Sequence, residues 1–183
     1  MDWIIPGTVL SGKREEAALV EQQFAAMFLG GGIVLSQVSS VTGLEPYTIQ
    51  NWVKRGFLIP PERKRYSLRQ LCRIININML KSVLPMEQIC GLLSYINGEL
   101  DDESDDIIDD SRLYFMFLRI VARYTAMQGL EDRDQIVAQE LETYQEPVPG
   151  ARDRVEKVLR IFLTAWVSAQ FRTMTEQMLS ELS

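Results

Sequence analysis

Apolar side chains recur at three- and four-residue steps along most of this 183-residue chain. That period is typical of amphipathic helices, because residues three and four apart share one face of a helix. The pattern predicts helices over residues 13–29, 36–42, 46–55, 68–81, 86–97, 111–128, 131–144 and 151–182. Only residues 33–35 read as a short extended stretch. The expected fold class is therefore mainly all-α.

Residues 36–55 read as two short helices joined by a glycine turn. Ser36 is expected to cap the first helix, Gly43 to end it with a positive φ, and Pro46 to open the second. The shared core would consist of Val38, Val41, Leu44, Ile49 and Val53. Such a pair is a candidate helix-turn-helix.

The second helix of this pair would carry polar side chains on its outer face, namely Tyr47, Thr48, Gln50, Asn51, Lys54 and Arg55. These residue types can hydrogen-bond base edges and phosphates in the major groove of DNA. Any surface helix also shows polar residues, so the face alone does not decide between the two interpretations.

A short basic loop follows the helix pair. Pro60-Pro61 forces an extended or turning path, and the next five residues are Glu62-Arg63-Lys64-Arg65-Tyr66. Ser67 and Gln70 then have the spacing of a capping box, which opens the next helix. A helix-turn-helix, a basic loop and two further helices make a winged-helix layout, in which the loop is the wing and lies on phosphates.

Charge is unevenly distributed along the chain. The net charge is −6, but residues 46–96 carry +6, whereas residues 1–45 carry −3 and residues 97–183 carry −9. A basic island in an acidic chain is what phosphate binding requires, although a solvated surface can produce the same pattern.

Several classes of protein are disfavoured by composition. The absence of histidine removes the commonest general acid–base and the usual zinc ligands, so we expect neither an enzyme nor a cofactor or metal site. Two cysteines make no disulfide framework, and Cys72 and Cys90 lie among apolar residues, where buried structural thiols are expected rather than sensors. No run of 18 apolar residues and no leader peptide is seen, which favours a cytoplasmic protein without membrane contact.

Residues 99–110 contain eight carboxylates in twelve positions. The spacing and the central glycine of an EF-hand are absent, so a solvated boundary is expected rather than a calcium site. Ser104 or one of the aspartates would cap the helix that follows.

The last third of the chain is expected to form a C-terminal helical region. Residues 111–128 look buried on nearly every side, and residues 151–182 keep an apolar stripe over a helix of about 45 Å. Such a helix outreaches a small domain, so we expect a homodimer, with packing inside one chain as the alternative. A small-molecule effector pocket or a plain core could be formed by Tyr114, Phe115, Met116, Phe117, Phe162, Trp166, Phe171, Met174 and Met178.

The central segment resembles the DNA-binding domain of the MerR family of bacterial transcription regulators. The resemblance lies in Ile33-Val34-Leu35-Ser36-Gln37-Val38, Val41-Thr42-Gly43-Leu44, Thr48-Ile49-Gln50-Asn51-Trp52, Lys54-Arg55-Gly56-Phe57-Leu58, Arg65-Tyr66-Ser67, Gln70-Leu71, Leu84-Pro85-Met86-Glu87-Gln88-Ile89 and Leu92-Leu93. More closely, Asn51-Trp52-Val53-Lys54, Pro60-Pro61, Lys64-Arg65-Tyr66-Ser67 and Ile77-Asn78-Met79-Leu80-Lys81 resemble an uncharacterised bacterial family, a MerR-like domain of unknown function (DUF1836).

The resemblance implies three parts: an N-terminal helix and linker (1–32), a MerR-like winged helix-turn-helix domain (33–98) and a C-terminal dimerisation or effector region (99–183). Helix 46–55 would read the major groove of double-stranded DNA, and wing 62–66 would contact phosphates. The chain departs from the MerR pattern in a short wing and in Gln50-Asn51-Trp52, where members commonly carry Arg-Tyr-Tyr. The expected function is a dimeric transcription regulator. The alternative is a protein-interaction module that keeps the scaffold without binding DNA.

Overall fold

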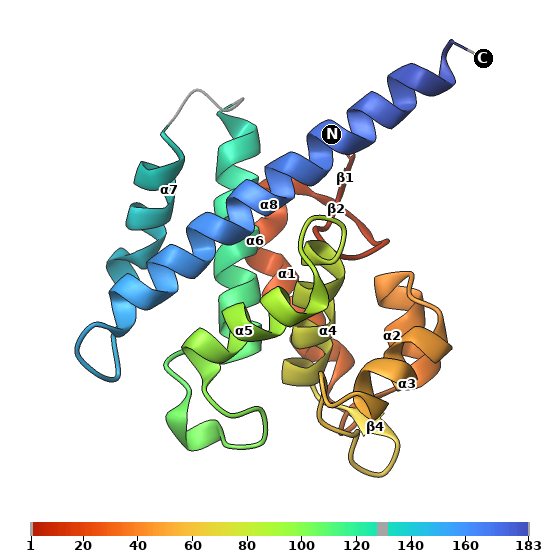
Figure 1. Ribbon diagram of the computed structural model, residues 1–183, viewed down its shortest axis with the longest axis vertical. Helices are drawn as coiled ribbons and strands as arrows, with labels where there is room; N and C mark the ends of the chain where they lie inside the picture. Colours follow the sequence, from red (N-terminus) through yellow and green to blue (C-terminus); the bar gives the residue numbers. More distant parts are fainter. Residues whose placement is uncertain (1, 128–131, 183) are drawn as a thin grey trace.

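The computed structural model describes residues 2–127 and 132–182 and is mostly helical, which confirms the expected mainly α-helical class (Figure 1). Its helices are α1 (Ala17–Met27), α2 (Leu35–Thr42), α3 (Pro46–Lys54), α4 (Leu68–Leu80), α5 (Met86–Asn97), α6 (Asp110–Ala126), α7 (Arg133–Glu140) and α8 (Ala151–Ser180). Its strands are β1 (Asp2–Ile4), β2 (Ser11–Lys13), β3 (Ile33–Val34) and β4 (Arg65–Tyr66). The expected helix end at 128 and helix start at 131 lie outside the described residues.

The helix pair α2 and α3 forms as predicted, with two differences. Helix α2 begins at Leu35 and is capped by Val34, whose backbone N–H donates to the Gln37 side chain at 2.9 Å, so Ser36 is not the cap. The glycine after α2 has the expected left-handed φ of 69°. Of the predicted core, Val38, Val41, Leu44 and Ile49 are buried, whereas Val53 is half-buried and Trp52 takes the inner position.

Strands β3 and β4 connect this helix pair to the segment that precedes α4. They are antiparallel, with Ile33 opposite Tyr66 and Val34 opposite Arg65. The capping box at the start of α4 is confirmed, because the Ser67 backbone N–H donates to Gln70 Oε1 at 2.9 Å and the Gln70 N–H to Ser67 Oγ at 3.2 Å. The basic loop therefore runs between α3 and a firmly capped helix.

The N-terminal residues form a hairpin that the hydrophobic pattern does not predict. Strand β1 pairs antiparallel with β2, and the Tyr114 hydroxyl on α6 donates a hydrogen bond of 3.0 Å to the Pro6 carbonyl between them. Helix α1 consequently begins at Ala17 rather than at residue 13. Leu19 and Met27, two of the apolar positions that predicted this helix, are exposed.

Helix α6 lies at the centre of the molecule and packs against α1, α4, α7 and α8 (Figure 1). Ten of its seventeen residues are buried and only Arg112, Arg123 and Ala126 are exposed, which confirms the expectation that nearly its whole circumference is covered. The buried apolar side chains form one continuous cluster from Ile5 to Ala165. Of the two alternatives for the aromatic and methionine residues, Tyr114, Phe115, Met116, Phe117 and Phe162 follow the plain core, whereas Phe171, Met174 and Met178 are exposed.

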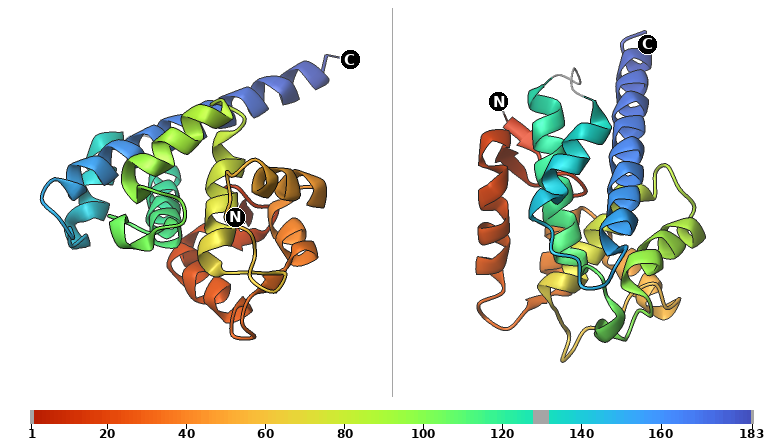
Figure 2. Two further views of the ribbon diagram at one scale, coloured as in Figure 1. Left: turned by 60° about the horizontal axis from the view of Figure 1, so that its bottom comes forward. Right: turned by 90° about the vertical axis from the view of Figure 1, so that its left-hand side faces the viewer.

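Helix α8 is 30 residues long, and its second half extends beyond the other helices (Figure 1 and Figure 2). Its first half is buried through Val155, Val158, Leu159 and Phe162. Residues 170–182 are exposed throughout, and they include the apolar side chains Phe171, Met174, Met178, Leu179 and Leu182. The helix does outreach the rest of the chain, as its length predicts.

Two further observations concern classes of site. No helix among residues 2–127 and 132–182 is both long and apolar enough to cross a membrane. Within the same residues no cluster of three or more metal-ligating side chains occurs. Cys72 is buried and Cys90 half-buried, and burial raises the pKa of both thiols.

Candidate nucleic-acid interface

Helix α3 presents a polar face to solvent. Ile49 and Trp52 fix the opposite face in the core. Of the predicted contact residues, Tyr47, Gln50, Lys54 and Arg55 are exposed, while Thr48 and Asn51 are half-buried. The Arg55 guanidinium lies 4.6 Å from the centre of the Phe57 ring, and this cation–π contact holds it near the C-terminal end of α3. The helix thus offers amide, hydroxyl and cationic groups on one accessible surface.

The basic loop closes in a tight turn whose two central residues are both cations. The Arg65 backbone N–H donates to the Glu62 carbonyl at 2.8 Å, and between them Arg63 and Lys64 have φ values of 48° and 64°. Left-handed backbone costs about 1–2 kcal/mol for a residue other than glycine, and such turns prefer Asn-Gly. We name residues 62–65 the basic turn. Arg63 and Lys64 therefore lower the stability of the fold relative to Asn-Gly, and they place two positive charges at the tip of the turn.

Arg65 and Tyr66 leave the turn in opposite environments. Arg65 is exposed, and its Nη1 donates to the Gly32 carbonyl at 2.8 Å. This hydrogen bond joins the turn to the linker after α1, residues 28–32. Tyr66 is only 3% exposed, and burial raises the pKa of its hydroxyl. Of the predicted contact residues, Tyr66 is therefore the one whose ring lies in the core, where it supports β4 instead of facing outward.

Helix α3 and the basic turn border one hollow of about 620 Å³. Gln50 from α3 and Lys64 from the turn both line it, so the structure brings these two predicted parts together. The remaining lining residues are Val34, Leu35, Ser36, Val53, Pro61 and Tyr66. Outside this hollow lie Tyr47, Thr48, Asn51 and Lys54 on α3 and Arg55 at its C-terminal cap.

Two other cations of the basic island are not available at the surface. Arg69 and Arg73 follow each other by one turn of α4, and both side chains are largely buried. Arg69 Nη2 lies 2.7 Å from Asp106 Oδ2, and Arg73 Nη1 lies 3.3 Å from Asp110 Oδ2. The sequence pattern did not predict this cluster, although the four-residue spacing of the two arginines indicates that they share one face of a helix.

The acidic segment 99–110 is consequently only partly the solvated boundary that its composition predicts. Asp106 and Asp110 are buried against α4, and burial raises the pKa of Asp110 even though Arg73 and Arg69 lower it. Asp109 caps α6, because its side chain accepts from the backbone N–H groups of Ser111 and Arg112. The expected aspartate cap is thus confirmed, and the buried pairs explain why the segment stays against α4.

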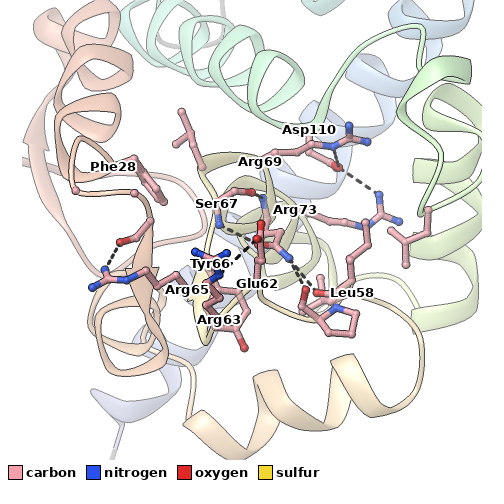
Figure 3. A pocket seen from close by; sticks show the side chains of 18 residues that line it. Phe28, Leu58, Glu62, Arg63, Arg65, Tyr66, Ser67, Arg69, Arg73 and Asp110 are labelled. Atoms are coloured by element: carbon pink, nitrogen blue, oxygen red, sulfur yellow. Dashed lines mark hydrogen bonds and ion pairs between the residues drawn. The ribbon is translucent and has the colours of Figure 1, made fainter.

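A second cavity, of about 690 Å³, lies between the basic turn and this buried cluster (Figure 3). Its walls are the linker after α1, the segment from Leu58 through the basic turn, the first part of α4, Leu100 and Asp110. Figure 3 shows the side chains of Arg65, Arg69 and Arg73 distributed around it. No sequence motif pointed to this cavity, because its walls come from segments separated by up to about eighty residues.

The site residues lie in a region that a known family shares. Residues 21–117, more than half of the chain, match the model of the family described as "Domain of unknown function (DUF1836)". The chain belongs to the DUF1836 family. The resemblance to DUF1836 seen in the sequence is therefore confirmed, and the matched region contains α3, the basic turn and both cavities.

This chain also has a relative among curated proteins. The chain is 34% identical over 86 residues to the uncharacterized protein YkrK of Bacillus subtilis (strain 168). The aligned stretch covers 45% of this chain and 37% of YkrK, so the chain spans little more than a third of that relative. No solved structure matches the DUF1836 chain.

Proposed function

We propose that this protein is a cytoplasmic, DNA-binding transcription regulator built on a MerR-like winged helix. In this proposal α3 lies in the major groove of double-stranded DNA, and β3, β4 and the basic turn form the wing. The observation that carries the proposal is the basic turn, where Arg63 and Lys64 hold left-handed backbone conformations beside an exposed polar helix. Strain of this kind is found where function requires it.

The proposed contacts divide into two kinds. Gln50 and Asn51 on α3 are assigned to base edges, where each good contact is worth about 1–3 kcal/mol of discrimination. Lys54, Arg55 and the three cations of residues 63–65 are assigned to phosphates, which fix position without reading sequence. Tyr47 and Thr48 complete the face of α3, and Tyr66 supports the turn from the core.

The regulator is proposed to act as a homodimer joined through the exposed half of α8. Phe171, Met174 and Met178 recur at helical spacing there, and residues 170–182 are all exposed. A second copy packed antiparallel would bury the same stripe from both sides, as a two-fold interface requires. Light scattering should give a dimer for the wild type and a monomer for Met174→Glu, whereas a monomeric wild type would refute this part.

Fluorescence anisotropy against short genomic duplexes, at low and physiological salt, tests the function directly. With ~6–10 phosphates neutralised by a dimer, affinity should fall roughly 10³–10⁵-fold between 50 and 200 mM salt. One duplex should stay tightly bound at physiological salt. Gln50→Ala should change which duplex is preferred, while Gln22→Ala, an exposed glutamine on α1, should change nothing. Equal, weak binding to every duplex would count against a specific regulator.

A protein-interaction module on the same scaffold is the second candidate. It is favoured by the hollow between α3 and the basic turn, whose floor of Val34, Leu35, Val53 and Pro61 suits an apolar side chain better than a phosphate. The acidic remainder of the chain also repels a polyanion. Binding to a protein partner that does not weaken with salt, together with no specific duplex, would establish this alternative.

A further inference from the structure

The cavity between the basic turn and the acidic segment has the size of a small-molecule site. Its volume of about 690 Å³ falls within the roughly 300–1,000 Å³ of ligand pockets. The linker after α1, the basic turn, α4 and residues 100–110 all contribute to its walls (Figure 3). An occupant would therefore lie between segments from the N-terminal part (1–32), the central part (33–98) and the C-terminal part (99–183) of the chain.

The charges that line this cavity favour an anion. Arg73 and Arg69 at the inner end are matched by the Asp110 carboxylate, at 3.3 and 3.9 Å. Arg65 at the other end reaches only the neutral Gly32 carbonyl, and no carboxylate of the described residues lies within 4.0 Å of its guanidinium. Arg63 and Glu62 face each other at 4.0 Å with both side chains 90% exposed, so solvent screens that pair. The outer end of the cavity thus keeps an excess of positive charge.

The rest of the lining favours an apolar body behind the anionic group. The side chains of Phe28, Leu58, Leu68 and Leu100 line the cavity, and all of them are at least partly buried. A Cβ added to Gly30 or Gly31 would meet no atom within 4 Å, so the linker backbone leaves open space there. Together with the volume of about 690 Å³, this open space leaves room for a body of ring size.

The inner end offers an unused acceptor. Asp110 is 1% exposed, and its Oδ1 is buried without a hydrogen-bond partner, while its Oδ2 bonds Arg73. A buried polar atom left unpaired costs about 1–3 kcal/mol. A donor carried by the occupant toward this wall would supply the missing hydrogen bond.

From these observations we infer that the cavity binds a small organic anion with an apolar ring body, its anionic group at Arg65 and its ring among Phe28, Leu58 and Leu100. Arg65 belongs to the basic turn, so the occupant competes with DNA phosphates for the same guanidinium. This coupling rests on the proposed function, whereas the binding of the anion does not. Binding of DNA and of the anion should weaken each other by the same factor.

Isothermal titration of the full chain without DNA tests the site. The probes are naphthoate and naphthyl phosphate, which share a ring and differ in the anionic group, and neutral naphthol. Saturable binding of either anion, at least about tenfold tighter than naphthol, is expected, and the tighter anion identifies the head group. Equal binding of naphthol, or no saturation by either anion, would overturn the inference.

Three variants locate the binding. Leu100→Trp fills the cavity and Arg65→Gln removes its excess charge, so each should weaken the anion at least about tenfold. Leu29→Trp adds the same ring to a residue that is 88% exposed next to the cavity, and should bind as the wild type does. Wild-type affinity in both Leu100→Trp and Arg65→Gln would place the anion elsewhere.

Adding the anion to the protein–DNA complex then tests the coupling. The apparent Kd for DNA should rise in the wild type and stay constant in Leu100→Trp, which leaves the DNA-facing residues intact. Saturable anion binding in a chain that binds no duplex would refute the proposed function and keep the site. DNA binding that the bound anion does not weaken would refute the competition at Arg65.

Discussion

Two groups of cations lie within one stretch of eleven residues, and one group is exposed to solvent while the other is buried. Arg63, Lys64 and Arg65 are exposed at a turn whose backbone is strained. Arg69 and Arg73 are buried one helical turn apart and are matched by Asp106 and Asp110. The first group carries charge that a polyanion can reach, and the second group fastens the acidic segment to α4.

This difference shows why the net charge of a segment is a poor measure of its binding surface. The basic island counts +6 by sequence, but Arg69 and Arg73 are neutralised by carboxylates from outside it. A buried charge must be paired, because its desolvation costs several kcal/mol. An exposed charge has no such requirement and keeps its field in solvent.

The largest expected effect comes from removing the exposed group. Changing Arg63, Lys64 and Arg65 together to glutamine should weaken binding to all duplexes alike, on the order of 10³-fold for a dimer at low salt. A matched control neutralises Arg133, Arg152 and Lys157, which are exposed on α7 and α8 and give the same change in net charge. Anisotropy titrations of both variants decide the matter. If both lose affinity equally, only the overall charge matters and the basic turn is not the contact.

Removing the carboxylate that pairs with the buried arginines should lower the free energy of unfolding. Asp110→Ala leaves Arg73 buried beside an empty site, and breaking a buried pair costs about 3–5 kcal/mol. Urea unfolding followed by circular dichroism measures the loss. Asp101→Ala, an exposed aspartate of the same acidic segment, should stay within about 0.5 kcal/mol of the wild type. Equal stability of the two variants would mean that the cluster does not hold the segment.

Relieving the strain of the turn should separate stability from binding. Arg63→Asn with Lys64→Gly fits the left-handed backbone, so the protein should gain about 1–2 kcal/mol of stability while its affinity for DNA falls. Arg63→Gln with Lys64→Gln removes the same charges and keeps the strain, so it should lose affinity without gaining stability. A gain of stability in both pairs would assign the effect to charge repulsion instead of backbone strain.

The smallest effect concerns pH. Burial raises the pKa of Asp110, so just above the ordinary pKa of aspartate the folded protein binds more protons than the unfolded chain. Stability contributed by this group therefore rises as pH falls through that window. Asp110→Asn has no carboxyl group to titrate at this position. As the pH falls through this window, the free energy of unfolding of the wild type should therefore rise relative to that of the variant. A difference that is constant with pH would show that Asp110 does not titrate there.

Local signals in the sequence were sufficient for the central helices. Helix α5 has the predicted bounds, and α4 begins at the predicted capping box, because these ends depend on residues within a few positions of each other. The N-terminal hairpin was missed because its loop is shaped by contact with α4, where a Cβ on Gly7 would meet the Ile75 carbonyl at 2.9 Å. No such contact can be read from neighbouring residues.

The candidate site was predictable to the same extent. The basic loop and the polar face of α3 were expected from residue type and period, and both are present at the surface. The left-handed φ values of Arg63 and Lys64 were not expected, since neither residue type prefers that conformation. The pairing of Arg73 with Asp110 joins residues 37 positions apart, so the burial of these cations could not be recognised from charge alone.

The position of α6 has a practical consequence for the expression of the family-matched segment, residues 21–117, by itself. The family match ends at residue 117, inside α6, whereas the packing does not end there. Phe117 meets the ring of Phe162 on α8 edge to face, with centroids 5.6 Å apart. A fragment cut at the limits of the match would cut α6 short and expose side chains such as Phe117, each costing about 1.5–3 kcal/mol. The segment that matches the family is thus shorter than the segment that can fold by itself. Expression trials should keep α7 and the buried half of α8.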